Sequence, residues 1–165
     1  MMMTHYMELL ASNQPWNLIL FMAIPVILAE TIAVTELYLL FSRRLNGKVA
    51  SLNRWASVLV GIYFLGIFVY LFKTAVIPLT ISGGWRGLAD VVAVGFYLAG
   101  VVPLGGMALL GLNIIGREKT AEDKLKLHAI WVAVFLIVAH IAMIFGMLNP
   151  EILGYVAPVV DHMGM

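Results

Sequence analysis

The chain contains no cysteine and few charged residues. Only 12% of its 165 residues are Asp, Glu, Lys or Arg, whereas soluble domains carry roughly 25%. The absence of cysteine excludes thiol catalysis, disulfides and cysteine-ligated zinc or iron–sulfur centres. The few charges cannot cover a soluble surface of this size, so we expect lipid to cover much of the protein. The net charge of +1 and the lack of a basic stripe argue against nucleic-acid binding.

Four long apolar runs make up most of the sequence. They cover residues 17–41, 55–81, 88–115 and 127–148. Each run exceeds the roughly 20 residues that a helix needs to cross about 30 Å of hydrocarbon. The sequence therefore predicts a single all-α domain over residues 1–165, a bundle of four transmembrane helices. Shorter segments of mixed polarity at 4–12 and 151–160 are expected to form interfacial helices, and Asn149 followed by Pro150 is a typical helix start.

Positive charge is concentrated in two of the three connections between the runs. Loops 42–54 and 116–126 hold four Lys or Arg residues each, out of ten in the chain. The positive-inside rule places such loops in the cytoplasm. We therefore expect a multi-pass protein of the plasma membrane with both termini outside.

Ionisable residues are rare within the runs, and each needs a partner or a function there. We expect a polar cluster open to the outside, formed by Lys73, Asp90 and His140 in the outer half of the bundle and by Glu30 nearer its middle. Glu30 is the preferred partner of Lys73, and Asp90 is the competing one. Acids outnumber the single lysine, so an unpaired acid would take up a proton or bind a cation. The alternative is a salt bridge and boundary acids that only hold the helices in register.

Two further ionisable residues, Glu36 and His128, are expected at the inner boundary of the membrane. Glu36 is placed within reach of Arg43 or Arg54, and His128 lies close to the basic loop that precedes the fourth run. We interpret both as boundary residues rather than as parts of the polar cluster.

Methionine and histidine recur in a pattern that a soft metal ion such as Cu(I) would favour. His140, Met143 and Met147 share one face of the fourth predicted helix. His5 and His162 lie in methionine-rich termini and extend this candidate copper site. Methionines at helical spacing also serve as ordinary core packing, which is the alternative.

A b-type haem is a further alternative and would use His140. His128 and His140 lie on the same predicted helix, 12 residues or about 18 Å apart, so they cannot bind one haem between them. The second axial ligand would have to be a methionine or the His140 of a second chain.

Four segments together resemble a family of small bacterial four-helix membrane proteins, often labelled permease-like. These segments are 13–19, 22–30, 90–97 and 139–150. The resemblance implies the same fold, a location in the bacterial inner membrane and a role in transport. Glu30, Asp90 and His140 lie within the matching segments, which supports them as site candidates.

No nucleophile–base pair, phosphate-binding loop or deaminase motif is visible, so we expect no autonomous enzyme. The leading hypothesis is a small transport or ion-handling protein whose polar cluster handles protons or a metal cation. Four spans form a thin wall around a pathway, so we expect a homo-oligomer or a larger membrane complex. The alternative functions are an accessory or structural subunit of a respiratory complex, and the haem protein described above.

Overall fold

The structure, a computed structural model, describes residues 2–156 and contains helices and loops but no strand in that range. Four helical segments are long and apolar enough to span a membrane, which confirms the predicted all-α four-helix bundle. They run over Trp16–Ser42, Lys48–Ser82, Gly87–Gly111 and Ala121–Met147. The lipid bilayer is therefore the natural surrounding of this protein.

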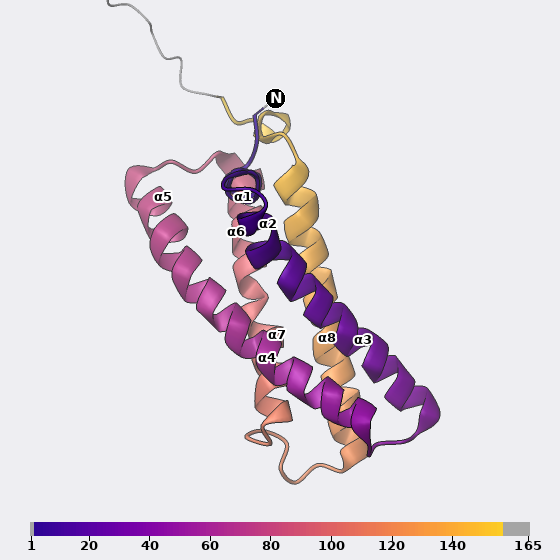
Figure 1. The fold of residues 1–165 in the computed structure, drawn as a ribbon. Coiled ribbons are helices and arrows are strands. Elements are labelled where there is room, and N and C mark those ends of the chain that lie inside the picture. Colours follow the sequence, from indigo (N-terminus) through magenta and orange to yellow (C-terminus); the bar gives the residue numbers. More distant parts are fainter. Residues whose placement is uncertain (1, 157–165) are drawn as a thin grey trace, which may run out of the picture.

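Several spans are interrupted by short π-helical turns or bends (Figure 1). In chain order the elements are α1 (His5–Ala11), α2 (Trp16–Leu18), the π turn η1 (Ile19–Ala23), α3 (Ile24–Ser42), α4 (Lys48–Leu71), the π turn η2 (Phe72–Val76), α5 (Ile77–Ser82), α6 (Gly87–Ala99), α7 (Val101–Gly111), α8 (Ala121–Met147) and the 3-10 turn η3 (Pro150–Leu153).

The helix ends differ from those predicted by hydropathy. The second and fourth spans begin at Lys48 and Ala121, several residues before the apolar runs. The fourth helix starts early because the Thr120 side chain accepts a hydrogen bond from a backbone N–H of its first turn. The third span ends at Gly111, earlier than the run, and the next residues form a turn in which Asn113 has φ 56°. Polar helix ends extend beyond the apolar runs, so hydropathy alone cannot detect them.

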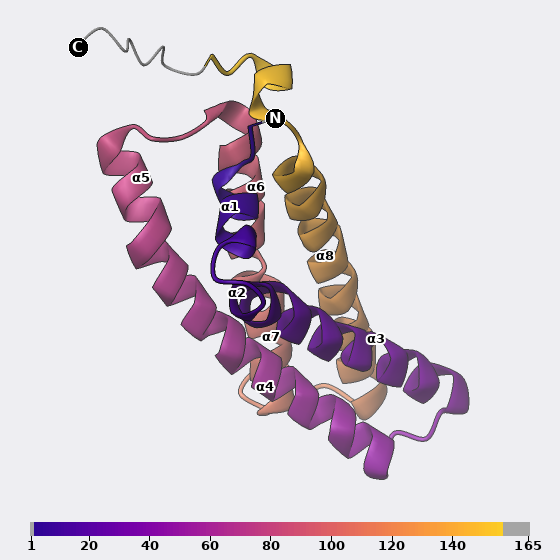
Figure 2. The same ribbon diagram turned by 45° about the horizontal axis from the view of Figure 1, so that its top comes forward.

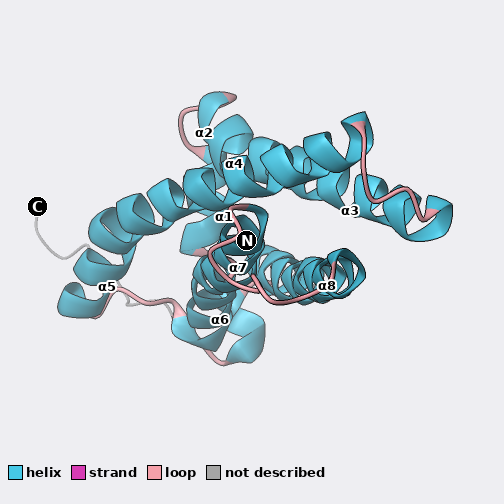
Figure 3. Cartoon of the chain, turned by 90° about the horizontal axis from the view of Figure 1, so that it is seen from below, coloured by secondary structure: helices cyan, strands magenta, loops and turns pink. Residues whose placement is uncertain are grey.

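The bundle has two distinct ends. One end, which we call the basic end, is formed by loops 43–47 and 112–120. The other, which we call the terminal end, carries the start of the chain, the turn between α5 and α6, and η3 (Figures 1 and 2). The second span tilts, so that α5 lies far from α8 when the bundle is seen along its length (Figure 3). As a result α5 has few contacts with other described elements beyond the adjoining η2 of its own helix.

Helix α1 crosses the terminal end and appears almost end-on in Figure 1. It packs against α2, α6 and α8, and it buries Tyr6 and Leu10 in the core. The Thr4 hydroxyl donates a hydrogen bond to the Gly146 carbonyl at 2.6 Å. A Cβ at Gly146 would lie only 2.5 Å from Tyr6 Cδ1, so glycine makes room for the tyrosine. The predicted N-terminal interfacial segment is therefore also anchored in the bundle.

The predicted segment 151–160 is a single turn in the part of the chain that the structure describes. The Asn149 side chain accepts from the backbone N–H of Glu151, and Pro150 follows, as the sequence predicted. Gly154 then adopts φ 85° and ends the turn. Residues 157–160 lie outside the described residues.

The closest contact between spans joins α4 and α7. A Cβ at Gly61 would lie 2.4 Å from Ala108 Cβ and 2.8 Å from the Leu104 carbonyl oxygen, so only glycine permits this approach. Gly106 likewise makes room for the Trp131 ring of α8. The glycine-rich third span therefore lies between α4 and α8 near the basic end.

Two tyrosines compensate for a proline in the first span. Pro25 has no N–H, so carbonyls in the preceding turn lose their usual helical partner, and the chain forms the π turn η1. The Tyr63 hydroxyl donates to the Leu20 carbonyl at 2.9 Å, and the Tyr97 hydroxyl donates to the Phe21 carbonyl at 2.5 Å. Helices α4 and α6 thereby fix the bend in the first span.

Candidate functional site

A buried polar network lies between three spans near the basic end. Glu36 comes from α3, Asn53 and Ser57 come from α4, and His128 comes from α8. Their exposed fractions are 3%, 6%, 0% and 6%, respectively. Polar groups this deeply buried are costly unless they are hydrogen-bonded, so the network specifies how these three helices meet.

The network centres on a carboxylate–imidazole pair. Glu36 Oε2 lies 2.6 Å from His128 Nδ1, and His128 Nε2 lies 2.7 Å from Ser57 Oγ. Asn53 Nδ2 also donates to Glu36 Oε2, at 3.1 Å. Glu36 Oε2 thus forms hydrogen bonds with side chains of both neighbouring spans.

Helical spacing explains why α4 supplies two members of the network. Asn53 and Ser57 are four residues apart and therefore share one face of the helix. The same Asn53 amide also donates to the Ile32 carbonyl at 3.2 Å and to the Thr35 hydroxyl at 2.9 Å. These bonds set the register of α3 against α4 and so aim Glu36 at His128.

The hydrogen bonds constrain where the protons of this network lie. Ser57 has one hydroxyl proton but two potential acceptors, the Asn53 carbonyl at 2.7 Å and His128 Nε2. If the proton points to Asn53, His128 Nε2 must carry its own proton and donate to Ser57. One more proton then lies between His128 Nδ1 and Glu36 Oε2, and the pair is neutral overall.

A second arrangement keeps both hydrogen bonds of His128 with one proton fewer, at the cost of the bond from Ser57 to the Asn53 carbonyl. The Ser57 hydroxyl then rotates to donate to His128 Nε2, and His128 Nδ1 keeps its proton and donates to an ionised Glu36. The network therefore has two self-consistent states that differ by one proton and by the direction of one hydroxyl. Glu36 Oε1 is buried and has no hydrogen-bond partner within the described residues, so it is free to accept a further bond.

A pocket leads from the basic end to this network. It has a volume of about 350 Å³, and Asn53 and His128 form part of its lining. Arg54 and Lys124 also line it, and none of the lining residues is acidic. The network is thus reached from the side of the basic loops.

A second polar cluster fixes α1 at the terminal end. Asp90, which is fully buried, accepts from the His5 backbone N–H at 2.7 Å, and its other oxygen lies 2.5 Å from His5 Nδ1. Arg86 pairs with Glu8 at 2.6 Å. Burial raises the pKa of Tyr6, in the same helix, to about 12. This cluster serves to hold the N-terminal helix in place.

The structure does not bring the four predicted cluster residues together. Asp90 pairs with His5, whereas Glu30, Lys73 and His140 are exposed on separate spans. No ion pair joins Glu30 to Lys73 within residues 2–156. Since Glu36 meets Asn53, Glu30 lies opposite about residue 59 of the antiparallel α4, which is 14 residues or about 21 Å from Lys73.

The candidate copper ligands that the structure describes lie in different surroundings. His140 is exposed and its Nδ1 bonds the Leu136 carbonyl of its own helix at 2.6 Å, while Met147 is 59% exposed. His5 belongs to the cluster at the terminal end, and His162 lies outside the described residues. Within the part of the chain that the structure describes, no three His, Asp or Glu side chains are grouped to hold a metal ion.

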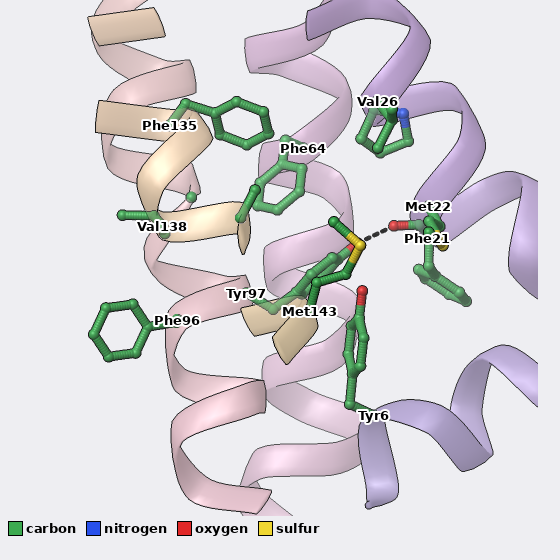
Figure 4. Close-up of a pocket in the computed structure, with 13 residues that line it drawn as sticks. Tyr6, Phe21, Met22, Val26, Phe64, Phe96, Tyr97, Phe135, Val138 and Met143 are labelled. Atoms are coloured by element: carbon green, nitrogen blue, oxygen red, sulfur yellow. Dashed lines mark hydrogen bonds between the residues drawn. The ribbon is translucent and has the colours of Figure 1, made fainter. Parts of the chain in front are cut away.

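The centre of the bundle, between the two polar clusters, is aromatic and nearly closed. Figure 4 shows a cavity there whose lining includes Phe64, Tyr97, Phe135 and Met143. Its volume of about 40 Å³ is far below the roughly 300–1,000 Å³ typical of ligand pockets. In this conformation it separates the two polar clusters rather than connecting them.

Comparison with known proteins places the chain in a family. Residues 1–162 match the family described as "Family of unknown function (DUF6803)". The chain belongs to this family. No curated protein and no solved structure matches the chain. A membrane-spanning helical protein is thus supported, whereas the permease-like label is not confirmed.

Proposed function

We propose that this protein is a small ion-handling membrane protein that binds a proton at the Glu36–His128 pair. The observation that supports the proposal most directly is the 2.6 Å contact between two buried titratable groups on different spans. The geometry favours a proton over a metal cation, because His128 Nδ1 occupies the position at Glu36 Oε2 that a cation would need.

The surroundings of the pair are compatible with reversible protonation. From α4 it faces the neutral Asn53 and Ser57, with the Arg54 side chain bonded to the Gly111 carbonyl at 2.6 Å. Lys124 lies one turn before His128 on α8, and α7 contributes no ionisable residue. Losing the proton leaves a net negative charge, which the two cations in the pocket partly compensate.

The proton would arrive from the basic end, through the pocket lined by Asn53 and His128. With the basic loops in the cytoplasm of a bacterial cell, as the charge distribution predicts, this side faces the cytoplasm. The aromatic centre favours proton binding coupled to a conformational change over an open proton wire. Transport would then require the helices around that centre to move.

The test is a proton-uptake measurement on the purified protein in detergent, with a pH-indicator dye and small acid additions. We expect Glu36→Gln and His128→Gln each to lose the same single proton per chain relative to the unmodified protein. Thr31→Val is the matched control, since it removes a polar side chain from the same helix without removing a titratable group. Uptake that is unchanged in Glu36→Gln, or lost equally in Thr31→Val, would refute the proposal.

We further propose that the protein works as an oligomer or within a larger complex. The end of the second span supports this, because α5 has few contacts beyond the adjoining η2 of its own helix and Lys73 stays exposed within an apolar span. A charge in lipid is costly and gains from a protein partner. Since the chain has no native cysteine, a single cysteine at Thr74 should cross-link to a neighbouring chain in native membranes, whereas one at Ile130 of α8 should not. Equal cross-linking at both positions would contradict a specific interface.

A further inference from the structure

The pocket at the basic end has the composition of an anion site. Two cationic side chains, Arg54 and Lys124, line it, and no Asp or Glu does. It is an open pocket lined by residues of α3, α4, α7 and α8 and of two loops, so its walls come from all four spans. Basic residues that only set the membrane orientation of the chain need no pocket. Here residues of four spans form a pocket of about 350 Å³ beside two of them.

Both cations are held in place by neutral acceptors. Arg54 Nε donates to the Gly111 carbonyl at 2.6 Å, and Lys124 Nζ donates to Asn113 Oδ1 at 2.9 Å. Neither side chain forms an ion pair with any residue between 2 and 156. The two Nη groups of Arg54 and two of the three ammonium protons of Lys124 therefore remain available to a ligand.

The interior of the pocket adds a buried polar group and an apolar wall. Asn53 is only 6% exposed, and all its recorded hydrogen bonds use Nδ2, which leaves the Oδ1 acceptor unused within the described part of the chain. Leu39, Leu110 and Leu125 provide apolar surface beside it. A ligand that fits carries negative charge toward the cations, a hydroxyl toward Asn53 and apolar atoms toward the leucines.

From this arrangement we propose that the pocket binds the phosphate group of a small phosphate ester. Arginine and lysine are the side chains that typically bind phosphate oxygens, and here they come from two different helices. Basic pockets between transmembrane helices also suit anionic lipid headgroups, and the pocket opens at the level of the basic loops. Phosphatidylglycerol supplies a phosphate and hydroxyls in its headgroup and apolar atoms in its acyl chains, and free glycerol phosphate supplies only the phosphate and the hydroxyls. The protein would bind phosphate here whether or not Glu36 exchanges a proton.

The binding test uses native mass spectrometry of the full chain. Protein released from phosphatidylcholine vesicles that contain phosphatidylglycerol should retain one phosphatidylglycerol per chain. Arg54→Gln combined with Lys124→Gln should weaken this binding at least tenfold. Arg44→Gln combined with Lys119→Gln is the matched control, because it removes two exposed charges from the same end outside the pocket.

A second variant tests the pocket without changing its charge. Ala50 forms part of the wall, so Ala50→Leu should fill the space and release the lipid while both cations remain. A parallel titration with glycerol phosphate in lipid-free detergent identifies the source of the phosphate. Saturable binding there supports a soluble phosphate ester, and its absence alongside retained phosphatidylglycerol supports the lipid. Equal lipid retention in both double variants, retention in Ala50→Leu, or no binding in either arm would overturn the proposal.

Discussion

The hydrogen bond from Tyr97 to the Phe21 carbonyl should stabilise the protein because Pro25 cannot bond that carbonyl, and this dependence on the proline can be tested. Tyr97→Phe removes the hydroxyl and leaves the carbonyl without its partner, because Pro25 has no N–H to offer. Loss of a partner for a buried acceptor costs about 1–3 kcal/mol. We therefore expect Tyr97→Phe to lower the free energy of unfolding by this amount.

The double variant distinguishes this cause from lost packing. Pro25→Ala restores a backbone N–H that can bond the Phe21 carbonyl, so the tyrosine hydroxyl becomes less important. In that background Tyr97→Phe should cost less than about 1 kcal/mol, near the net value of one ordinary hydrogen bond. The two substitutions should then couple by about 1–2 kcal/mol, as expected for residues that share a partner.

The measurement is reversible unfolding in mixed micelles of a mild detergent and dodecyl sulfate, followed by circular dichroism. Tyr70→Phe is the control, since Tyr70 stacks on Phe21 with ring centroids 5.9 Å apart and its hydroxyl forms no hydrogen bond with any residue between 2 and 156. It should change stability little. If Tyr97→Phe is equally destabilising with and without Pro25, the tyrosine does not compensate for the proline.

Three further predictions concern the packing of the bundle. Gly61→Ala should destabilise the protein by about 1–3 kcal/mol in the same unfolding assay, because the new Cβ would lie 2.4 Å from Ala108 Cβ. Gly66→Ala should be neutral or stabilising, because no atom lies within 4 Å of its Cβ position. Asp90→Asn should loosen α1, seen as faster amide hydrogen exchange in residues 5–11, while Glu118→Gln should leave that exchange unchanged. Burial raises the pKa of Tyr6 to about 12, so this burial stabilises the docked α1 fully below pH 10, and the contribution is lost as the pH rises through about 12. Tyr6→Phe should abolish that alkaline transition. A transition that persists in Tyr6→Phe would assign it to another group.

The fold was predictable because a segment surrounded by lipid must be apolar and long enough to cross the membrane, and the sequence gives both properties directly. Each of the four spans was identified from its apolar run, and the all-α architecture followed. The ends of the helices were not predictable in the same way. Thr120 caps the fourth span but lies in a polar segment, which hydropathy alone assigns to a loop. Capping rules applied to Thr120, with acidic residues in the turn that follows, would have located this start.

The candidate site was only partly predictable. Glu36 and His128 were identified but assigned separately to the boundary, because sequence alone gives depth along a helix but not the register between helices. Glu30 was expected to pair with Lys73, yet the antiparallel register with α4 places it about 21 Å along the helix axis from Lys73. Asn53 and Ser57 were missed, although two polar residues four apart at the start of an apolar run were a usable signal.

The site at the terminal end was missed for a related reason. His5 lies 85 residues from Asp90 in the chain, and nothing local indicates that the N-terminal helix folds back onto α6. A tertiary contact of this kind depends on how α1 fits against Gly146 and Tyr97. The packing of the whole bundle, rather than any segment of it, determines that pair.

The most direct test of the central claim is to observe protons on the His128 imidazole in a lipid bilayer. Solid-state ¹⁵N NMR of histidine-labelled protein reports the protonation of both ring nitrogens, and the resonance is assigned through its loss in His128→Gln. We expect both nitrogens of His128 to carry hydrogen-bonded protons on the acidic side of the titration and one proton to be lost reversibly on the alkaline side. The titration should change in Glu36→Gln but not in Glu30→Gln. A His128 signal that stays constant over the whole pH range in which the protein remains folded would contradict a proton-binding Glu36–His128 pair.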